Sequence, residues 1–276
     1  MVSTDFYSIT SSRIANFYKI NGAELAKNLV HLAAQKRFAK PGENISDYLR
    51  SEKIQRENSD YTGVKNELQV ALAMMNVAER TAMSIKDDLI RMGDLVDRYY
   101  DADTTADEQA AIEDEFNLLK TGITDFIGNT YYDNKLLIQD TSLTQPLRSI
   151  LLDPYDTSQT FDIDYDSGDV PDVAALDVTA GQAAAGAAVQ AELDKAYSYL
   201  AKTSGYIFGL NSQYNMAINK VLNNKAADSA ISDVDGAKEL LEVTKRSLRQ
   251  QSSVAMLSQL NISRQSVLSL IMWWKD

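Results

Sequence analysis

The 276-residue sequence contains no cysteine, four prolines and twelve glycines. Without cysteine the chain has no disulfide framework, no thiolate nucleophile and no cysteine-based metal site. Because proline and glycine interrupt helices, their scarcity leaves room for long uninterrupted helices. No apolar run approaches the roughly 20 residues of a membrane-spanning helix. The first residues lack a basic stretch followed by an apolar one, so no cleaved secretory signal is expected.

Positive charge is also scarce, because 27 basic against 39 acidic residues give a formal net charge of −12. This balance argues against a nucleic acid or an anionic membrane as partner, since both recruit basic surfaces. Catalytic motifs are missing as well: there is no G-x-S-x-G, H-E-x-x-H, P-loop or G-x-G-x-x-G. His31 is the only histidine, and a lone histidine without cysteine makes a poor zinc site. The sequence therefore predicts no enzyme, no metal and no cofactor.

The clearest positive signal is a heptad pattern between Tyr61 and Tyr100. Apolar residues recur there at intervals of seven, at Leu68, Met75, Ala82, Leu89 and Val96. A second apolar row follows each of them by three residues, which is typical of a coiled-coil stripe. The pattern predicts one helix of roughly 60 Å. A second helix is expected at about residues 107–129, with one apolar stripe at Ile112, Phe116, Leu119, Ile123 and Ile127.

A third helix is expected at about residues 183–224, again with a heptad stripe. Each narrow stripe needs a facing stripe, so the three helices predict a mainly α fold, a long antiparallel bundle or coiled-coil rod. The expected rod core combines both main stripes: Leu68, Met75, Leu89, Val96, Leu193, Leu200, Ile207 and Tyr214. Periodicity alone would fit any helical bundle.

The middle of the chain changes character, and a small β-hairpin region is expected from about residue 136 to 178. Residues 160–166 alternate strictly between apolar and polar, which predicts a strand with Phe161, Ile163 and Tyr165 on one face. The aspartates between them superficially resemble a calcium loop, but the glycine and the twelfth position do not fit one.

Both ends of the chain carry apolar stripes on predicted helices. The C-terminal stripe contains Leu241, Leu248, Ala255, Ile262, Val267 and Leu270, and the N-terminal one contains Ile14, Tyr18, Leu25 and Leu32. One reading is a C-terminal helix that docks back onto its own core. An exposed apolar face invites association, however, so we favour helices that find partners in an assembly.

Three stretches of the chain carry recognisable motifs. The C-terminal segment closes with Q-x-N-x-x-x-Q-x-V-L-x-L at residues 259–270, which resembles the ending of bacterial flagellins. Residues 123–137 resemble the flagellin stretch that ends in T-x-F-N-G-x-x-L-L. Asn134 stands in place of the usual glycine, and asparagine is the next most tolerant residue for a left-handed turn. Residues 31–44 match a third flagellin motif loosely, with Gln35 in place of its glycine. The chain departs from the family in its short middle and in residues 272–276, which follow the closing motif.

The resemblance implies a structural subunit that polymerises into the bacterial flagellar filament for motility, with terminal helices pairing to form the inner core. It implies further copies of the chain as partners, together with an export chaperone and cap or junction proteins. It also implies export through the flagellar type III pathway. A hook–filament junction protein and a flagellin-like surface adhesin or receptor are the alternatives.

The same resemblance divides the chain into five parts. Residues 1–45 and 236–276 would be the filament-core helices, 46–140 and 191–235 the two halves of the rod, and 141–190 a short variable middle. The segment at Arg91 and Leu95 resembles the surface that the innate immune flagellin receptor recognises. Ile90 stands there in place of the usual glutamine and Asp94 in place of glutamate, and these two differences predict poor activation of that receptor.

Overall fold

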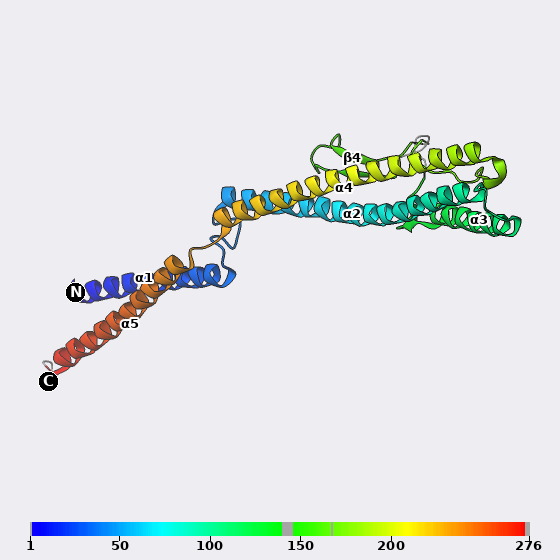
Figure 1. The fold of residues 1–276 in the computed structure, drawn as a ribbon. Coiled ribbons are helices and arrows are strands. Elements are labelled where there is room, and N and C mark those ends of the chain that lie inside the picture. The colour runs from blue at the N-terminus through cyan, green and yellow to red at the C-terminus, as the bar shows by residue number, and fades with distance from the viewer. Residues whose placement is uncertain (1, 140–145, 167, 274–276) are drawn as a thin grey trace. The chain divides into compact units, whose positions relative to one another are not determined.

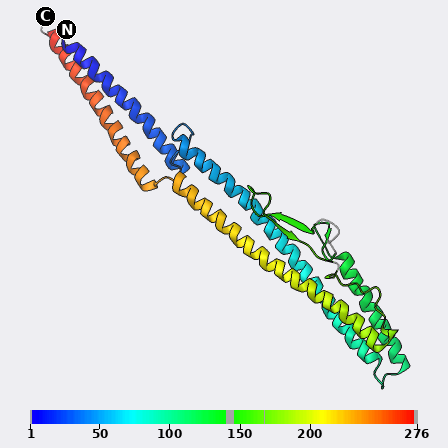
Figure 2. The same cartoon turned by 90° about the horizontal axis from the view of Figure 1, so that it is seen from above.

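The structure is a computed structural model that describes residues 2–139, 146–166 and 168–273, apart from the side chains at positions 2–8, 263–264, 267–268 and 270–272 (Figures 1 and 2). It forms two compact units, which we call the terminal unit (Met1–Arg56 with Asn224–Asp276) and the central unit (Glu57–Asn223). The five α-helices are α1 (Val2–Ala34), α2 (Ile45–Tyr99), α3 (Ala106–Asn129), α4 (Gln182–Ser232) and α5 (Gly236–Trp273). The shorter elements are β1 (Tyr131–Tyr132), β2 (Lys135–Leu136), β3 (Arg148–Leu151), β4 (Thr160–Ile163) and the 3-10 helix η1 (Val178–Ala180).

Antiparallel helices α2 and α4 build the core of the central unit. Glu79 accepts a hydrogen bond from Ser204 at 3.1 Å, and Tyr61 accepts one from Lys220 at 2.9 Å, so the two helices run in opposite directions. Both rows of the α2 heptad are buried. These contacts confirm the predicted mainly α fold with paired heptad helices.

Helix α2 begins at Ile45, sixteen residues before the first residue of the predicted heptad stretch. Asn44 caps this end, because its side-chain oxygen accepts a hydrogen bond from the amide of Asp47 at 3.2 Å. The first turns lack the heptad stripe of the later ones, so the sequence pattern gave no sign of them. A helix can therefore extend beyond the stripe that reveals it.

Helix α3 packs its apolar face into the same core. Thr105 and Glu108 form a capping box at its start, each bonding the backbone amide of the other. Ile112, Phe116 and Ile123 are buried along the helix. The apolar period of this segment thus predicted both the helix and its inward face.

Two small antiparallel hairpins follow α3 and confirm the predicted β-hairpin region. Strands β1 and β2 pair through a tight turn in which Asp133 and Asn134 have φ angles of 51° and 59°. The left-handed conformation explains why asparagine is tolerated at position 134, where the flagellins that this stretch resembles have glycine. The first hairpin starts at Tyr131, slightly earlier than predicted.

The second hairpin pairs β3 with β4 and packs against α4. Ile163 and Tyr165 are buried and Phe161 is half-buried, as the alternating sequence predicted. The rings of Tyr165 and Tyr199 stack with their centroids 4.3 Å apart, and the Tyr165 hydroxyl lies 2.8 Å from that of Thr203. These contacts fix the hairpin region to the helical core of the central unit.

In the terminal unit, α1 and α5 pair in antiparallel fashion. Asn21 on α1 donates a hydrogen bond to the carbonyl of Arg246 on α5 at 2.6 Å. After α1, Gln35 adopts a left-handed φ of 54°, and Lys36 forms an isolated antiparallel bridge with Asp233. Helix α1 thus ends beside a residue in the left-handed conformation, at the position where the flagellins that this stretch resembles have glycine.

Candidate assembly surface

Helix α5 turns a largely polar row toward α1. This row repeats at alternating intervals of four and three residues and contains Glu239, Val243, Arg246, Gln250, Ser253, Leu257 and Leu260. All of these side chains are half-buried. The sequence reasoning missed the row because most of its members are polar, although the 4-3 spacing is the same signal as in an apolar heptad.

The predicted apolar stripe lies on another face of α5 and is open to solvent. Leu241, Leu248 and Ile262 are 54%, 57% and 64% exposed, and Ala255 is exposed as well. The stripe therefore does not dock onto this chain's own α1. The side chains of Val267 and Leu270, which were predicted to complete it, lie outside the described residues.

Some apolar side chains of helix α1 are half-buried, and others are exposed to solvent. Ile14, Leu25 and Leu32 are half-buried, whereas Tyr18 is exposed. Further large apolar side chains of α1 are open to solvent: Ile9, Phe17, Ile20, Leu29 and Val30. The described terminal unit thus presents apolar surface on both helices, which is the pattern of a surface made for association.

A buried histidine holds one end of this helix pair together. His31 Nε2 lies 3.0 Å from Glu43 Oε2, and its Nδ1 lies 3.7 Å from Glu239 Oε1. Glu43 also accepts a hydrogen bond from the amide of Ala39 at 2.7 Å. Burial raises the pKa of the Glu43 carboxyl, but the hydrogen bonds from Ala39 and His31 outweigh it, so the pKa is lowered. His31 thus joins α1, the following loop and α5.

The two units differ sharply in charge. The terminal unit has 16 basic and 11 acidic residues, a net charge of +5. The central unit has 11 basic and 28 acidic residues, a net charge of −17. Residues 6–23 and 243–274 contain six basic residues and no acidic one. The acidic composition of the whole chain therefore hides a basic stretch in its terminal helices.

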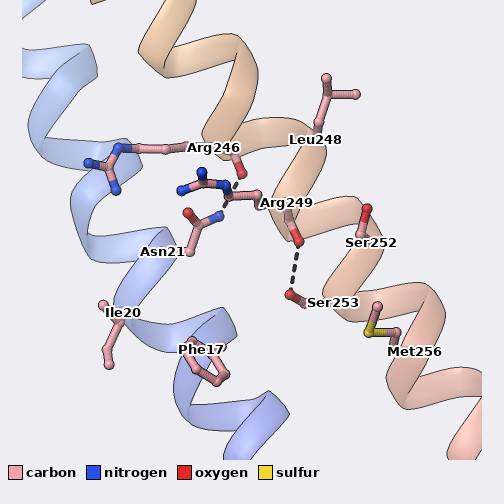
Figure 3. A pocket seen from close by; sticks show the side chains of 9 residues that line it. All are labelled: Phe17, Ile20, Asn21, Arg246, Leu248, Arg249, Ser252, Ser253 and Met256. Atoms are coloured by element: carbon pink, nitrogen blue, oxygen red, sulfur yellow. Dashed lines mark hydrogen bonds between the residues drawn. The ribbon is translucent and has the colours of Figure 1, made fainter.

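A groove of about 470 Å³ runs between α1 and α5 within this basic stretch (Figure 3). Arg246 and Arg249 both extend from α5 toward α1, close to Asn21. Apolar side chains form the other walls: Phe17 and Ile20 from α1, and Leu248 and Met256 from α5. Arg246 lies 3.5 Å from Glu24, yet its Nε is buried without a hydrogen-bond partner. The groove thus combines apolar walls with cationic groups.

The remaining predicted residues lie in the central unit. Leu68, Met75, Leu89 and Val96 are buried, and their counterparts on α4, Leu193, Leu200, Ile207 and Tyr214, are half-buried. Arg91 is exposed and forms an ion pair with Glu115 at 2.7 Å. Leu95 is fully buried, so of the two residues of the expected receptor-facing surface only Arg91 lies on the surface.

Among the described residues, no group of three His, Cys, Asp or Glu side chains is arranged to hold a metal ion. No described helix has the length and apolar character needed to cross a membrane.

Comparisons with known proteins find similarity to flagellins. Residues 192–271 match the model of the bacterial flagellin C-terminal helical region. The chain is 26% identical to the flagellin of Halalkalibacterium halodurans, over 91% of this chain and 93% of that protein. It is 24% identical to the flagellin of Bacillus subtilis strain 168, over 96% of this chain and 98% of that protein.

The crystal structure of Bacillus cereus flagellin aligns with 58% of this chain and 88% of its own, at 18% identity and a TM-score of 0.38. The family model covers α5 up to Ile271 and most of α4, and the two flagellins extend the match over both units. The chain is therefore similar to bacterial flagellins over most of its length, and residues 192–271 match their C-terminal helical region.

Proposed function

We propose that this chain is a structural subunit that polymerises with copies of itself into the bacterial flagellar filament. The observation that carries the proposal is the exposed apolar stripe of α5, at Leu241, Leu248 and Ile262. This stripe remains open although α5 already packs against α1 through another face. Each large apolar side chain removed from water contributes about 1.5–3 kcal/mol, so burying this stripe between copies would favour polymerisation.

Self-association through the stripe predicts an open polymer. The stripe on α5 differs from the face that binds α1, so one copy can contact others through distinct surfaces. A heterologous contact of this kind, when it does not close into a ring, generates a helical filament. We therefore assign the filament-core role to Ile14, Tyr18, Leu25 and Leu32 on α1, and to the residues of the α5 stripe.

The test is electron microscopy of the purified chain under salting-out conditions, in parallel with a truncation after Asp235. The full chain should form filaments. The truncated chain lacks α5, so it should remain a monomer that keeps the helical central unit. Filaments from the truncated chain, or none from the full chain, would contradict the proposal.

The same reading extends to location and partners. A filament subunit must leave the cell, and we propose the flagellar type III pathway, with an export chaperone that covers the apolar stripe before assembly and a cap or junction protein at the filament ends. A structural rather than catalytic role is supported by the lack of enzyme motifs in the sequence. A hook–filament junction protein or an adhesin is less well supported, since Q-x-N-x-x-x-Q-x-V-L-x-L is a flagellin ending.

A further inference from the structure

In the groove between α1 and α5, one arginine and one buried donor of a second arginine have no partner among the described residues, although the second arginine pairs with Glu24 through another nitrogen. Arg249 has no ion-pair partner among the described residues, and the Nε of Arg246 is buried without an acceptor. An unpaired buried donor costs about 1–3 kcal/mol. The groove is therefore built to receive a group that offers an acceptor or an aromatic face together with apolar surface.

We propose that the groove of each copy binds the segment Trp273-Trp274-Lys275-Asp276 of a neighbouring copy. Indole is the best aromatic partner for a guanidinium, and Trp273 is 80% exposed in the described structure. The next carboxylate along the chain after Glu242 is that of Asp276. Two indoles and a carboxylate thus complement apolar walls and two arginines.

The segment cannot reach the groove of its own chain. Trp273 lies seventeen residues beyond Met256 on α5, which is about 26 Å along a helix. The three residues that follow span at most about 11 Å when extended. The occupant must therefore come from a second copy, displaced along the helix axis by about 25–30 Å. The inference rests on the proposed polymerisation and specifies the axial offset between two contacting copies.

Another segment of similar makeup, Asp5-Phe6-Tyr7, lies near the start of the chain. Its phenyl and phenol rings are weaker partners for a guanidinium than indole. The experiment therefore has to distinguish the two segments.

Because the chain has no cysteine, a crosslink between two introduced cysteines reports the contact between those two positions alone. The variant Ser252→Cys with Lys275→Cys places one thiol at the groove and one in the segment, and leaves both tryptophans and both arginines in place. A short bismaleimide applied to filaments should produce a ladder of covalent oligomers. The soluble monomer should give none. Either single-cysteine variant can give nothing larger than a dimer, because each copy then carries one thiol.

Two results would overturn the proposal: filaments of the double variant without a ladder, or an equal ladder from Thr4→Cys with Ser252→Cys. In both cases filaments form, so the proposed function would survive. If the unmodified chain forms no filaments, both are wrong.

A second measurement uses matched charge removals on α5. Arg249→Gln removes a groove cation, whereas Lys245→Gln removes one that is paired with Glu242 at 3.0 Å outside the groove. Arg249→Gln should raise the critical concentration for polymerisation about five- to tenfold, because a desolvated cation–π contact is lost. Lys245→Gln should change it by less than about twofold, since exposed ion pairs contribute little. Equal effects of the two variants would contradict the groove contact.

Discussion

Phe161 on β4 packs directly over Gly209 on α4. A Cβ atom added to Gly209 would come within 2.9 Å of two atoms of the phenyl ring. The ring also meets Tyr206 edge-on, with centroids 6.2 Å apart. The close approach of β4 to α4 therefore depends on the absence of a side chain at position 209.

Gly209→Ala should destabilise the central unit by about 1–3 kcal/mol, because the added methyl group forces Phe161 out of its position. Gly205→Ala on the same helix is the matched control, since nothing lies within 4 Å of its added Cβ. That change should stabilise the chain by up to about 1 kcal/mol, as alanine is the better helix former. Urea unfolding followed by circular dichroism measures both, and equal shifts of the midpoint would contradict the contact.

Leu89→Ala should lower the free energy of unfolding by about 2–5 kcal/mol, because Leu89 is fully buried and the change leaves a cavity. Its neighbour Ile90 is exposed, so Ile90→Ala should cost less than about 1 kcal/mol. Thermal melts of the two variants would show the difference. If Leu89→Ala melted like the unmodified chain, the heptad register of α2 would be wrong.

Gln35→Gly should stabilise the terminal unit by about 1 kcal/mol, since a left-handed φ costs a residue with a Cβ roughly 1–2 kcal/mol. Gln35→Val should destabilise it, because a β-branched residue tolerates this conformation poorly. Hydrogen exchange of the amides around residues 31–39 would report the change. Slower exchange in the valine variant than in the glycine variant would argue against the turn.

The loop after α1 should loosen in acid. The pKa of Glu43 is lower in the folded state, so its stabilisation is complete above the ordinary glutamate pKa of about 4.3 and is lost as the pH falls through the lowered value. Hydrogen exchange over residues 35–44, corrected for intrinsic rates, should therefore lose protection at acidic pH. In Glu43→Gln the protection should be weaker at neutral pH and should change less with pH. Identical pH profiles of protection in the unmodified chain and in Glu43→Gln would contradict the stabilising role of the Glu43 carboxylate.

The sequence predicted those parts of the fold that depend on local residue spacing within a single helix, strand or turn. Leu68 and Leu89 share a heptad row, and Phe161 and Ile163 share a strand face, because these intervals follow from helix and strand geometry. Asn134 marked its turn because few residues adopt a left-handed conformation.

The contacts that join distant segments were not predictable in this way. His31, Glu43 and Glu239 come from three separate stretches, and no local spacing brings them together. The inner row of α5 was also missed, since residues such as Arg246 and Ser253 do not stand out from a solvent-facing helix. The first turns of α2 were not predicted either, because the apolar period does not extend back to the cap at Asn44.

The charge of the central unit makes any polymer of this chain a polyelectrolyte. Every added copy brings a net charge of −17 in that unit, so growth works against the repulsion among all copies already in place. At about 0.1 M salt the screening length is about 10 Å, which confines this repulsion to near neighbours. Ionic strength therefore sets how much of the apolar contact energy is left for elongation. The same negative charge makes neighbouring polymers repel each other, which opposes bundling.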